Sequence, residues 1–335
     1  MDDTVRITTK RIARRQFAAN VLRVGTPVAI LALLWSYLDG PHIIDRLAHT
    51  DWRWISAALL TAILQIVLSA WRWQLTARAL GLPLQTAYTI REYFVAQLIN
   101  QTLPGGVVGD IARAVRSQRG VTLAIAGQAV VLERAAGQIA IFAVMLAGLT
   151  VVAIVPGGLS LPPTVINFGI LAIAAILAIM LAWLTWKYIG LPQRLRLLAS
   201  SSRHALFGRS VWLWQVLLGL AIVACNLATF AFAARATGTP LSLAAMMSIV
   251  PLILTAMLLP LSIGGWGFRE GAAAVLLPVA GATPEGAVAA SVAFGIVILA
   301  ASLPGILWLF RPHATSPWAP FKGRHSEFQM TRTRR

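Results

Sequence analysis

The chain has 335 residues, of which 58% are hydrophobic and only 12% are charged. Soluble domains carry about 25% charged residues, so this composition excludes an ordinary soluble protein and predicts a polytopic membrane protein. The formal net charge of +17 comes from short basic blocks beside apolar runs. Cytoplasmic loops of membrane proteins show this pattern, whereas a nucleic-acid-binding face does not.

Six apolar runs are long enough to cross a bilayer, because a helical span needs about 20 residues. Tryptophans gather near the ends of these runs, as in the interfacial belts of membrane proteins. The predicted spans are Val24–Leu38, Ile55–Trp73, Gly137–Val155, Thr164–Trp186, Val211–Ala234 and Glu285–Phe310.

Two further apolar segments are interrupted by proline and glycine. Glu92–Leu103 runs into PGGVVGDIARAVRS, and Leu243–Leu259 runs into PLSIGGWGFRE. Backbone that is not helical cannot face lipid, because its polar groups would be unsatisfied. We therefore predict a re-entrant hairpin of broken helices at each place. The residues that shape the breaks are Pro104, Gly105, Gly106, Gly109, Pro260, Gly264, Gly265 and Gly267.

With six spans and two hairpins, the basic residues divide sharply between the two sides of the membrane. All but four of the 28 lysines and arginines then lie on the side of the termini, which the positive-inside rule places in the cytoplasm. Eight full spans would instead put the arginines of residues 187–209 outside. The exceptions in the six-span arrangement are Arg46, Arg53, Arg235 and Arg269.

This topology predicts a multi-pass protein of the bacterial inner membrane in three parts. Residues 1–22 form a basic cytoplasmic tail, residues 23–312 the transmembrane domain, and residues 313–335 a basic, disordered cytoplasmic tail. Within the domain, units of about 55–155 and 211–310 each read as span, broken hairpin, span. The two hairpins enter from opposite sides, so the units form an inverted repeat typical of secondary transporters.

The two breaks also align with one another. After Pro104 and after Pro260, a glycine follows five residues later and an arginine nine residues later. Ionisable groups at membrane depth cost about 2.5–3.5 kcal/mol and usually face a protein interior, and a helix restarting after a break suits an anion. We predict that three arginines converge on a lipid phosphate beside acidic counter-ions. The predicted substrate-binding residues are Arg113, Arg134, Arg269, Asp110, Glu133, Glu270 and Asn100.

Simpler interpretations stay open for these polar groups. The charged residues can be structural ion pairs, and the neighbouring amides can serve as helix–helix hydrogen-bonding groups. The amides concerned are Gln97, Asn100, Gln101, Gln138 and Asn226.

Three sequence blocks resemble a known family. INQTLPGGVVGDIARAVRSQRG, VVLERAAGQ and LLPLSIGGWGFREGA look like the signature of the lysylphosphatidylglycerol synthase transmembrane region, also called the flippase-like or UPF0104 family. The resemblance covers roughly residues 20–312 and implies lipid handling. In bifunctional members this region flips an aminoacylated phospholipid that a separate soluble domain makes. The sequence offers no segment for such a domain, so we expect no lysyl transfer and no enzyme activity.

The leading functional hypothesis is a lipid or lipid-linked-intermediate translocase. It would hold an anionic headgroup in a midplane cavity between the two hairpins. Cys225 is the only cysteine and the histidines lack metal-site spacing, so we expect no metal and no cofactor. The sequence has no Walker motif, so we expect no direct use of ATP. The expected partner is a membrane phospholipid or lipid-linked substrate, and not a nucleic acid.

Two alternatives come from other functional classes. One is a non-catalytic membrane partner of a separate envelope-lipid biosynthetic enzyme. The other is an integral-membrane transferase acting on a lipid headgroup, with Asp110 or Glu133 as the base.

Overall fold

The computed structural model describes residues 25–118, 122–154, 208, 211–257 and 262–310. These residues are predominantly helical and contain no β-strand, so the predicted all-α class is confirmed. Several predictions fall outside the described residues: the span Thr164–Trp186, the two tails and Pro260.

Four stretches of helix are long and apolar enough to cross a membrane, and they overlap four of the six predicted spans. Side chains cap two of them: the Asp51 carboxylate accepts from the Arg53 N–H at 2.9 Å, and the Thr283 hydroxyl from the Gly286 N–H at 3.1 Å. The stretches are α3 (Trp52–Ala79), α6 (Leu123–Ile154), α9 (Trp212–Ala236), and α12 (Pro284–Ser302) continued by α13 (Pro304–Leu309).

The first predicted span, Val24–Leu38, ends at a sharp bend. Helix Gly25–Tyr37 turns by 99° into α2 (Gly40–Ala48). The Asp39 carboxylate caps α2 by accepting a hydrogen bond from the His42 N–H at 3.3 Å. If this bent pair is one span, the described residues contain five candidate spans, and otherwise four.

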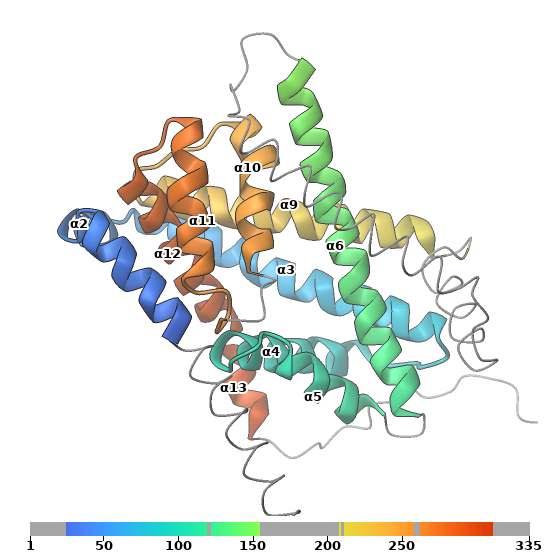
Figure 1. Cartoon of the computed structure of the whole chain (residues 1–335). Coiled ribbons are helices and arrows are strands. Elements are labelled where there is room, and N and C mark those ends of the chain that lie inside the picture. The colour runs from blue at the N-terminus through green and yellow to red at the C-terminus, as the bar shows by residue number, and fades with distance from the viewer. Residues whose placement is uncertain (1–24, 119–121, 155–207, 209–210, 258–261, 311–335) are drawn as a thin grey trace, which may run out of the picture.

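The core is built on close helix contacts. α3 and α9 pack side by side, α6 crosses both, and α12 packs against the same two helices (Figure 1). Between α9 and α12, the ring centroids of Phe230 and Phe294 lie 5.3 Å apart. Small residues let membrane helices approach closely. Buried alanines on α3, α9 and α12 include Ala58, Ala62, Ala70, Ala233, Ala234, Ala289 and Ala290.

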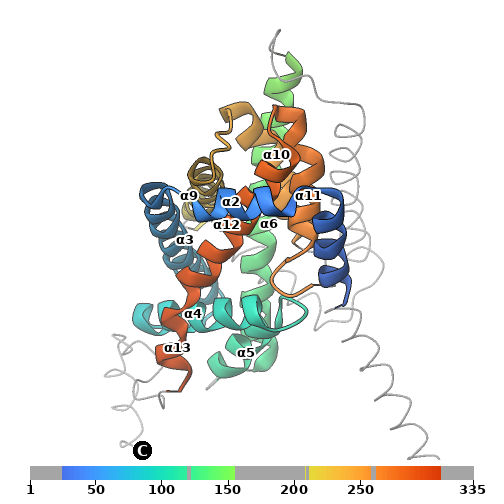
Figure 2. The same ribbon diagram turned by 90° about the vertical axis from the view of Figure 1, so that its left-hand side faces the viewer.

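Both predicted broken segments are helix pairs joined by a loop. None of the four helices reaches the roughly 20 residues that a full span requires. In Figure 2 the two pairs lie one above the other, and their loops approach each other. The first pair is α4 (Thr86–Thr102) and α5 (Val108–Ser117); the second is α10 (Leu243–Ala256) and α11 (Phe268–Leu276), followed by the 3-10 helix η1 (Leu277–Ala280).

The two loops touch through their backbones. Pro104 and Ile263 form an isolated antiparallel β-bridge, and the Gly105 N–H donates to the Ser262 carbonyl at 3.2 Å. Each bridge residue is followed by two glycines with positive φ, a conformation that residues with a side chain rarely adopt. These pairs are Gly105–Gly106 and Gly264–Gly265.

This geometry changes the correspondence between the two breaks. When the two glycine pairs are superimposed, Pro104 corresponds to Ile263, its partner in the bridge. The spacing of residues in the sequence instead predicts that Pro104 corresponds to Pro260. The full inverted repeat of six spans also needs residues that the structure does not describe, so that arrangement stays a prediction.

Candidate functional site

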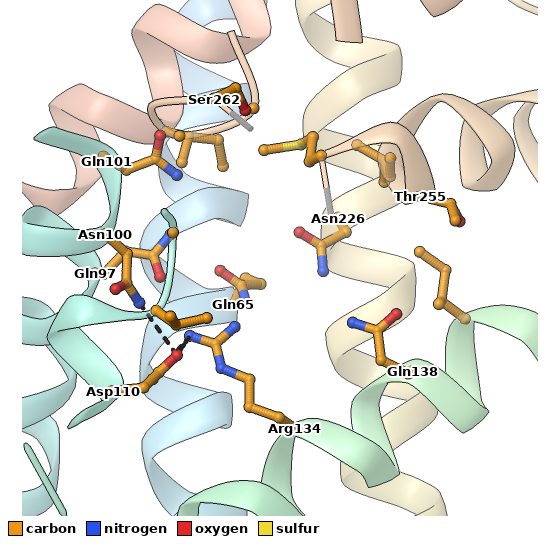
Figure 3. Close-up of a pocket in the computed structure, with 18 of the residues that line it drawn as sticks. Gln65, Gln97, Asn100, Gln101, Asp110, Arg134, Gln138, Asn226, Thr255 and Ser262 are labelled. Carbon is orange, nitrogen blue, oxygen red and sulfur yellow. Dashed lines mark hydrogen bonds and ion pairs between the residues drawn. The ribbon is translucent and has the colours of Figure 1, made fainter. Parts of the chain in front are cut away.

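A cavity of about 420 Å³ lies beside the point where the two loops meet. Both glycine pairs line it, together with Ser262 from the second loop. Side chains from α3, α4, α5, α6, α9, α10 and α12 complete the wall. We call this space the central cavity; Figure 3 shows its polar lining.

An ion pair between Arg134 and Asp110 stands on the wall of the central cavity (Figure 3). Arg134 Nη2 lies 2.9 Å from Asp110 Oδ2, and the Arg134 side chain is 42% exposed. Asn100 fixes the carboxylate from the other side: its Nδ2 donates to Asp110 Oδ2 at 3.3 Å, and its Oδ1 accepts from the Gly109 N–H at 2.8 Å. Helices α4, α5 and α6 therefore position this pair together.

The ion pairs continue inward from the cavity wall. Arg113 Nη2 contacts Asp110 Oδ1 at 3.0 Å and Glu133 Oε2 at 2.7 Å. Arg72 Nη2 lies 2.7 Å from Glu133 Oε1. We call these five residues the arginine network. Its three arginines and two carboxylates leave one positive charge in excess, and the most exposed member, Arg134, faces the cavity.

Packing holds the inner part of the network in place. The Arg113 guanidinium lies over the Trp73 ring at 4.8 Å and the Tyr93 ring at 4.5 Å, and the Tyr93 hydroxyl donates to Glu133 Oε1 at 3.2 Å. Gly137 leaves room for Arg72, since a Cβ there would lie 2.8 Å from Nη2. Buried charges need such partners, because an unpaired charge in the interior is costly.

A second, separate ion pair lies beside the second loop. Arg269 and Glu270 are both fully buried; Arg269 Nε donates to Glu270 Oε1 at 3.0 Å and to Ser291 Oγ at 3.0 Å. The other Glu270 oxygen accepts from the Gly267 N–H at 2.6 Å, which caps the start of α11. The Arg269 guanidinium also lies 5.0 Å from the centre of the Trp266 ring. We call Arg269, Glu270 and Ser291 the Arg269 cluster.

The predicted substrate-binding residues thus fall into three places. Asn100, Asp110 and Arg134 are together on the cavity wall. Arg113 and Glu133 lie directly behind them, and the Arg269 cluster is apart from both, with neither Arg269 nor Glu270 lining the cavity. Among the described residues, the three predicted arginines therefore do not converge on one point; Arg134 is the one on the cavity wall.

The predicted loop residues divide in a similar way. Gly105, Gly106, Gly264 and Gly265 line the cavity, and Pro104 forms the bridge. Gly267 is the N-cap residue of α11 and has a φ of +82°. Gly109 packs α5 onto α4, because a Cβ there would collide with the Ala96 carbonyl.

Sequence reasoning missed Arg72 and Tyr93, which complete the arginine network. Arg72 had been counted among the basic residues of the cytoplasmic side. Its place inside the predicted span Ile55–Trp73 was a usable signal, because an arginine within a span usually faces a protein interior. Tyr93 carried no such signal, since its role depends on how α4 packs against α5 and α6.

The fold and the site define a class: a multi-pass helical membrane protein in which two broken helix pairs meet beside a polar cavity. The chain belongs to the lysylphosphatidylglycerol synthase TM region family, which matches residues 20–305. A comparison with curated proteins finds no significant match. The family resemblance seen in the three sequence blocks is thereby confirmed.

Proposed function

We propose that this protein is a lipid translocase that binds an anionic headgroup in the central cavity. The observation that carries the proposal is the cationic excess of the arginine network, presented at the cavity by a partly exposed Arg134. Arg134 uses Nη2 alone in its contacts with Asp110 and its Nε is buried, so its Nη1 group is available to a phosphate.

The meeting of the two loops supports the same proposal. A phospholipid headgroup cannot cross hydrocarbon without losing its hydration, so a translocase needs a polar path while the acyl chains stay in lipid. The central cavity offers polar side chains among helices that are otherwise apolar. The glycine pairs on its wall have positive φ, and glycine permits a change of backbone conformation more readily than residues with a side chain do.

The transferase alternative finds less support. It requires a carboxylate that can accept a proton from the reacting group. Asp110 contacts two arginines, Arg113 and Arg134, and Glu133 contacts Arg72 and Arg113. These contacts occupy both carboxylates, so neither is free to approach a reacting group.

Leaflet exchange in reconstituted vesicles tests the proposal. The purified chain is placed in liposomes that contain a phosphatidylglycerol labelled with a fluorophore on its acyl chain, and dithionite quenches the outer leaflet. We expect quenching beyond the outer-leaflet fraction in vesicles with protein. Exchange no faster than in protein-free vesicles, across several anionic lipids, would overturn the proposal.

A matched pair of variants tests the site. Arg134→Ala should slow exchange about tenfold or more, because a charge-assisted hydrogen bond contributes about 1.5–3 kcal/mol. Arg53→Ala removes an exposed arginine outside the cavity lining and should leave exchange unchanged. If Arg134→Ala exchanged lipid as fast as the unmodified chain, the assignment of Arg134 as a binding residue would be wrong, but the proposed translocase activity would not be affected.

A further inference from the structure

Six side-chain amides line the central cavity and come from four different helices. They are Gln65 on α3, Gln97, Asn100 and Gln101 on α4, Gln138 on α6 and Asn226 on α9. Figure 3 shows them around the same space as Arg134.

Three of these amides lie close to the midpoints of candidate spans. Gln65, Gln138 and Asn226 are near the centres of α3, α6 and α9. A polar group without a partner in an apolar environment costs several kcal/mol, so amides at this depth need hydrogen-bond partners. The cavity they share is where such partners can be found.

Much of this hydrogen-bonding capacity is unused within the described chain. The side chains of Gln97, Gln138 and Asn226 make no hydrogen bond to any other described residue. Gln101 Oε1 and Ser262 Oγ are buried without a partner, and their residues are only 8% and 2% exposed. The interpretation of Gln97, Gln138 and Asn226 as helix–helix hydrogen-bonding groups therefore fails for the described helices.

The chemistry of the lining discriminates between kinds of headgroup. An amide presents a donor and an acceptor side by side, which matches hydroxyl groups, since each hydroxyl both donates and accepts. An ammonium group is held most strongly by a free carboxylate, but Asp110 is already held by two arginines and Asn100. The positive excess of the arginine network also repels a cation.

We infer that the headgroup has one phosphate bearing a hydroxyl-rich group, a polyol or a sugar, and no amine. Arg134 binds the phosphate, and amides such as Gln138 and Asn226 bind the hydroxyls. The inference rests on the proposed function, and it names the class of lipid that the same cavity takes.

Equilibrium binding of matched lipids to the purified full chain tests this inference independently of transport. Native mass spectrometry in detergent compares dioctanoyl phosphatidylglycerol with dioctanoyl phosphatidylethanol and phosphatidylethanolamine. The first two carry the same single negative charge, and only phosphatidylglycerol has free hydroxyls. We expect phosphatidylglycerol to bind about tenfold more tightly than phosphatidylethanol, because two hydrogen bonds to neutral partners are lost, and phosphatidylethanolamine to bind most weakly.

Two other results would overturn the inference. Equal binding of phosphatidylglycerol and phosphatidylethanol would show recognition of phosphate alone, and tight binding of phosphatidylethanolamine would show that an amine is accepted. Neither result would contradict the proposed function, because that proposal is tested separately by leaflet exchange.

Variants of the amides separate hydroxyl recognition from a structural role. Gln138→Met and Asn226→Leu should each lower phosphatidylglycerol binding about three- to tenfold and leave phosphatidylethanol binding unchanged. A structural role would instead weaken the binding of both lipids alike. Gln215→Met is the matched control: Gln215 also lies on α9, but its amide donates to Thr76 Oγ1 at 2.9 Å, away from the cavity lining, so the preference should persist.

Discussion

The two loops are built from the same parts, yet their charged residues are arranged differently. Each has a glycine pair with positive φ and a fully buried arginine nearby. Beside the first loop, Arg113 joins a network that draws in Arg72 and Arg134 from two other helices and reaches the cavity. Beside the second loop, Arg269 pairs with its own neighbour Glu270 and is shielded from the cavity.

This difference shows when charge near a helix break indicates binding. A carboxylate adjacent in sequence can neutralise an arginine completely and at the same time cap the new helix, as Glu270 does for Gly267. Ion pairs that link several helices, with more arginines than carboxylates, leave charge available to a ligand. Under the proposed function, the arginine network beside the first loop would bind the headgroup, whereas the second loop lines the cavity without exposing its arginine.

Locking the two loops together should have the largest effect on transport. Residues paired across an antiparallel bridge have Cα atoms about 4.5–5.5 Å apart, which suits a disulfide. With Cys225→Ser as background, we expect Pro104→Cys with Ile263→Cys to cross-link on oxidation and to abolish leaflet exchange. Reductant should restore exchange, and either cysteine alone should be insensitive to oxidant. Undiminished exchange in the cross-linked protein would mean that the loops need not separate.

Removing Arg269 should have the largest effect on stability. Arg269→Ala leaves Glu270 fully buried without its cation, which costs about 3–5 kcal/mol. Arg134→Ala should cost far less, because Arg134 is partly exposed and Asp110 keeps its contact with Arg113. Denaturant unfolding in detergent, followed by tryptophan fluorescence, measures both.

A double variant checks the physical reason. Arg269→Met with Glu270→Gln removes both charges and keeps a side-chain acceptor for the Gly267 N–H. It should be more stable than Arg269→Ala alone. If Arg269→Ala unfolded like the unmodified chain, or if Arg134→Ala proved the less stable of the two, the contrast between the loops would be wrong.

Close packing behind the first loop should have an intermediate effect. Gly109→Ala forces a methyl group against the Ala96 backbone and separates α4 from α5, at about 1–3 kcal/mol. Exchange should fall as well, because the Gly109 N–H holds Asn100 beside Asp110. Gly127→Ala on α6 is the control: nothing described lies within 4 Å of the added Cβ, so stability should be unchanged or slightly higher. Equal behaviour of the two variants would contradict this packing.

The elements of the fold that depend on local sequence could be predicted. Apolar runs predicted four spans that the structure contains. Pro104 and its glycines marked the first break and Gly264 and Gly265 the second, because helix breakers act on their own backbone. The bend after Tyr37 was not predicted, although Asp39 and Gly40 stand at it. Apolar content reports the length of a run and says nothing about the angle between two helices.

The partners of the charged residues could be predicted only where they are neighbours. Arg269 with Glu270, and Asp110 with Arg113, are close in the sequence, and both pairs form. The contact between Arg72 and Glu133 joins α3 to α6 and depends on helix packing, which a single sequence does not specify. For the same reason, the sequence identified three candidate binding arginines but could not tell that Arg134 is the one that reaches the cavity.

The smallest expected effect separates charge from geometry at Arg134. Arg134→Lys keeps the positive charge beside Asp110 but loses the planar fork that binds phosphate through parallel hydrogen bonds. We expect exchange to slow about three- to tenfold, with unfolding unchanged. Arg113→Lys is the comparison. A lysine cannot contact two carboxylates and two rings at once, so the main effect of this variant should be a lower free energy of unfolding. If Arg134→Lys lost stability while Arg113→Lys lost only exchange, the phosphate-binding arginine would be the inner one.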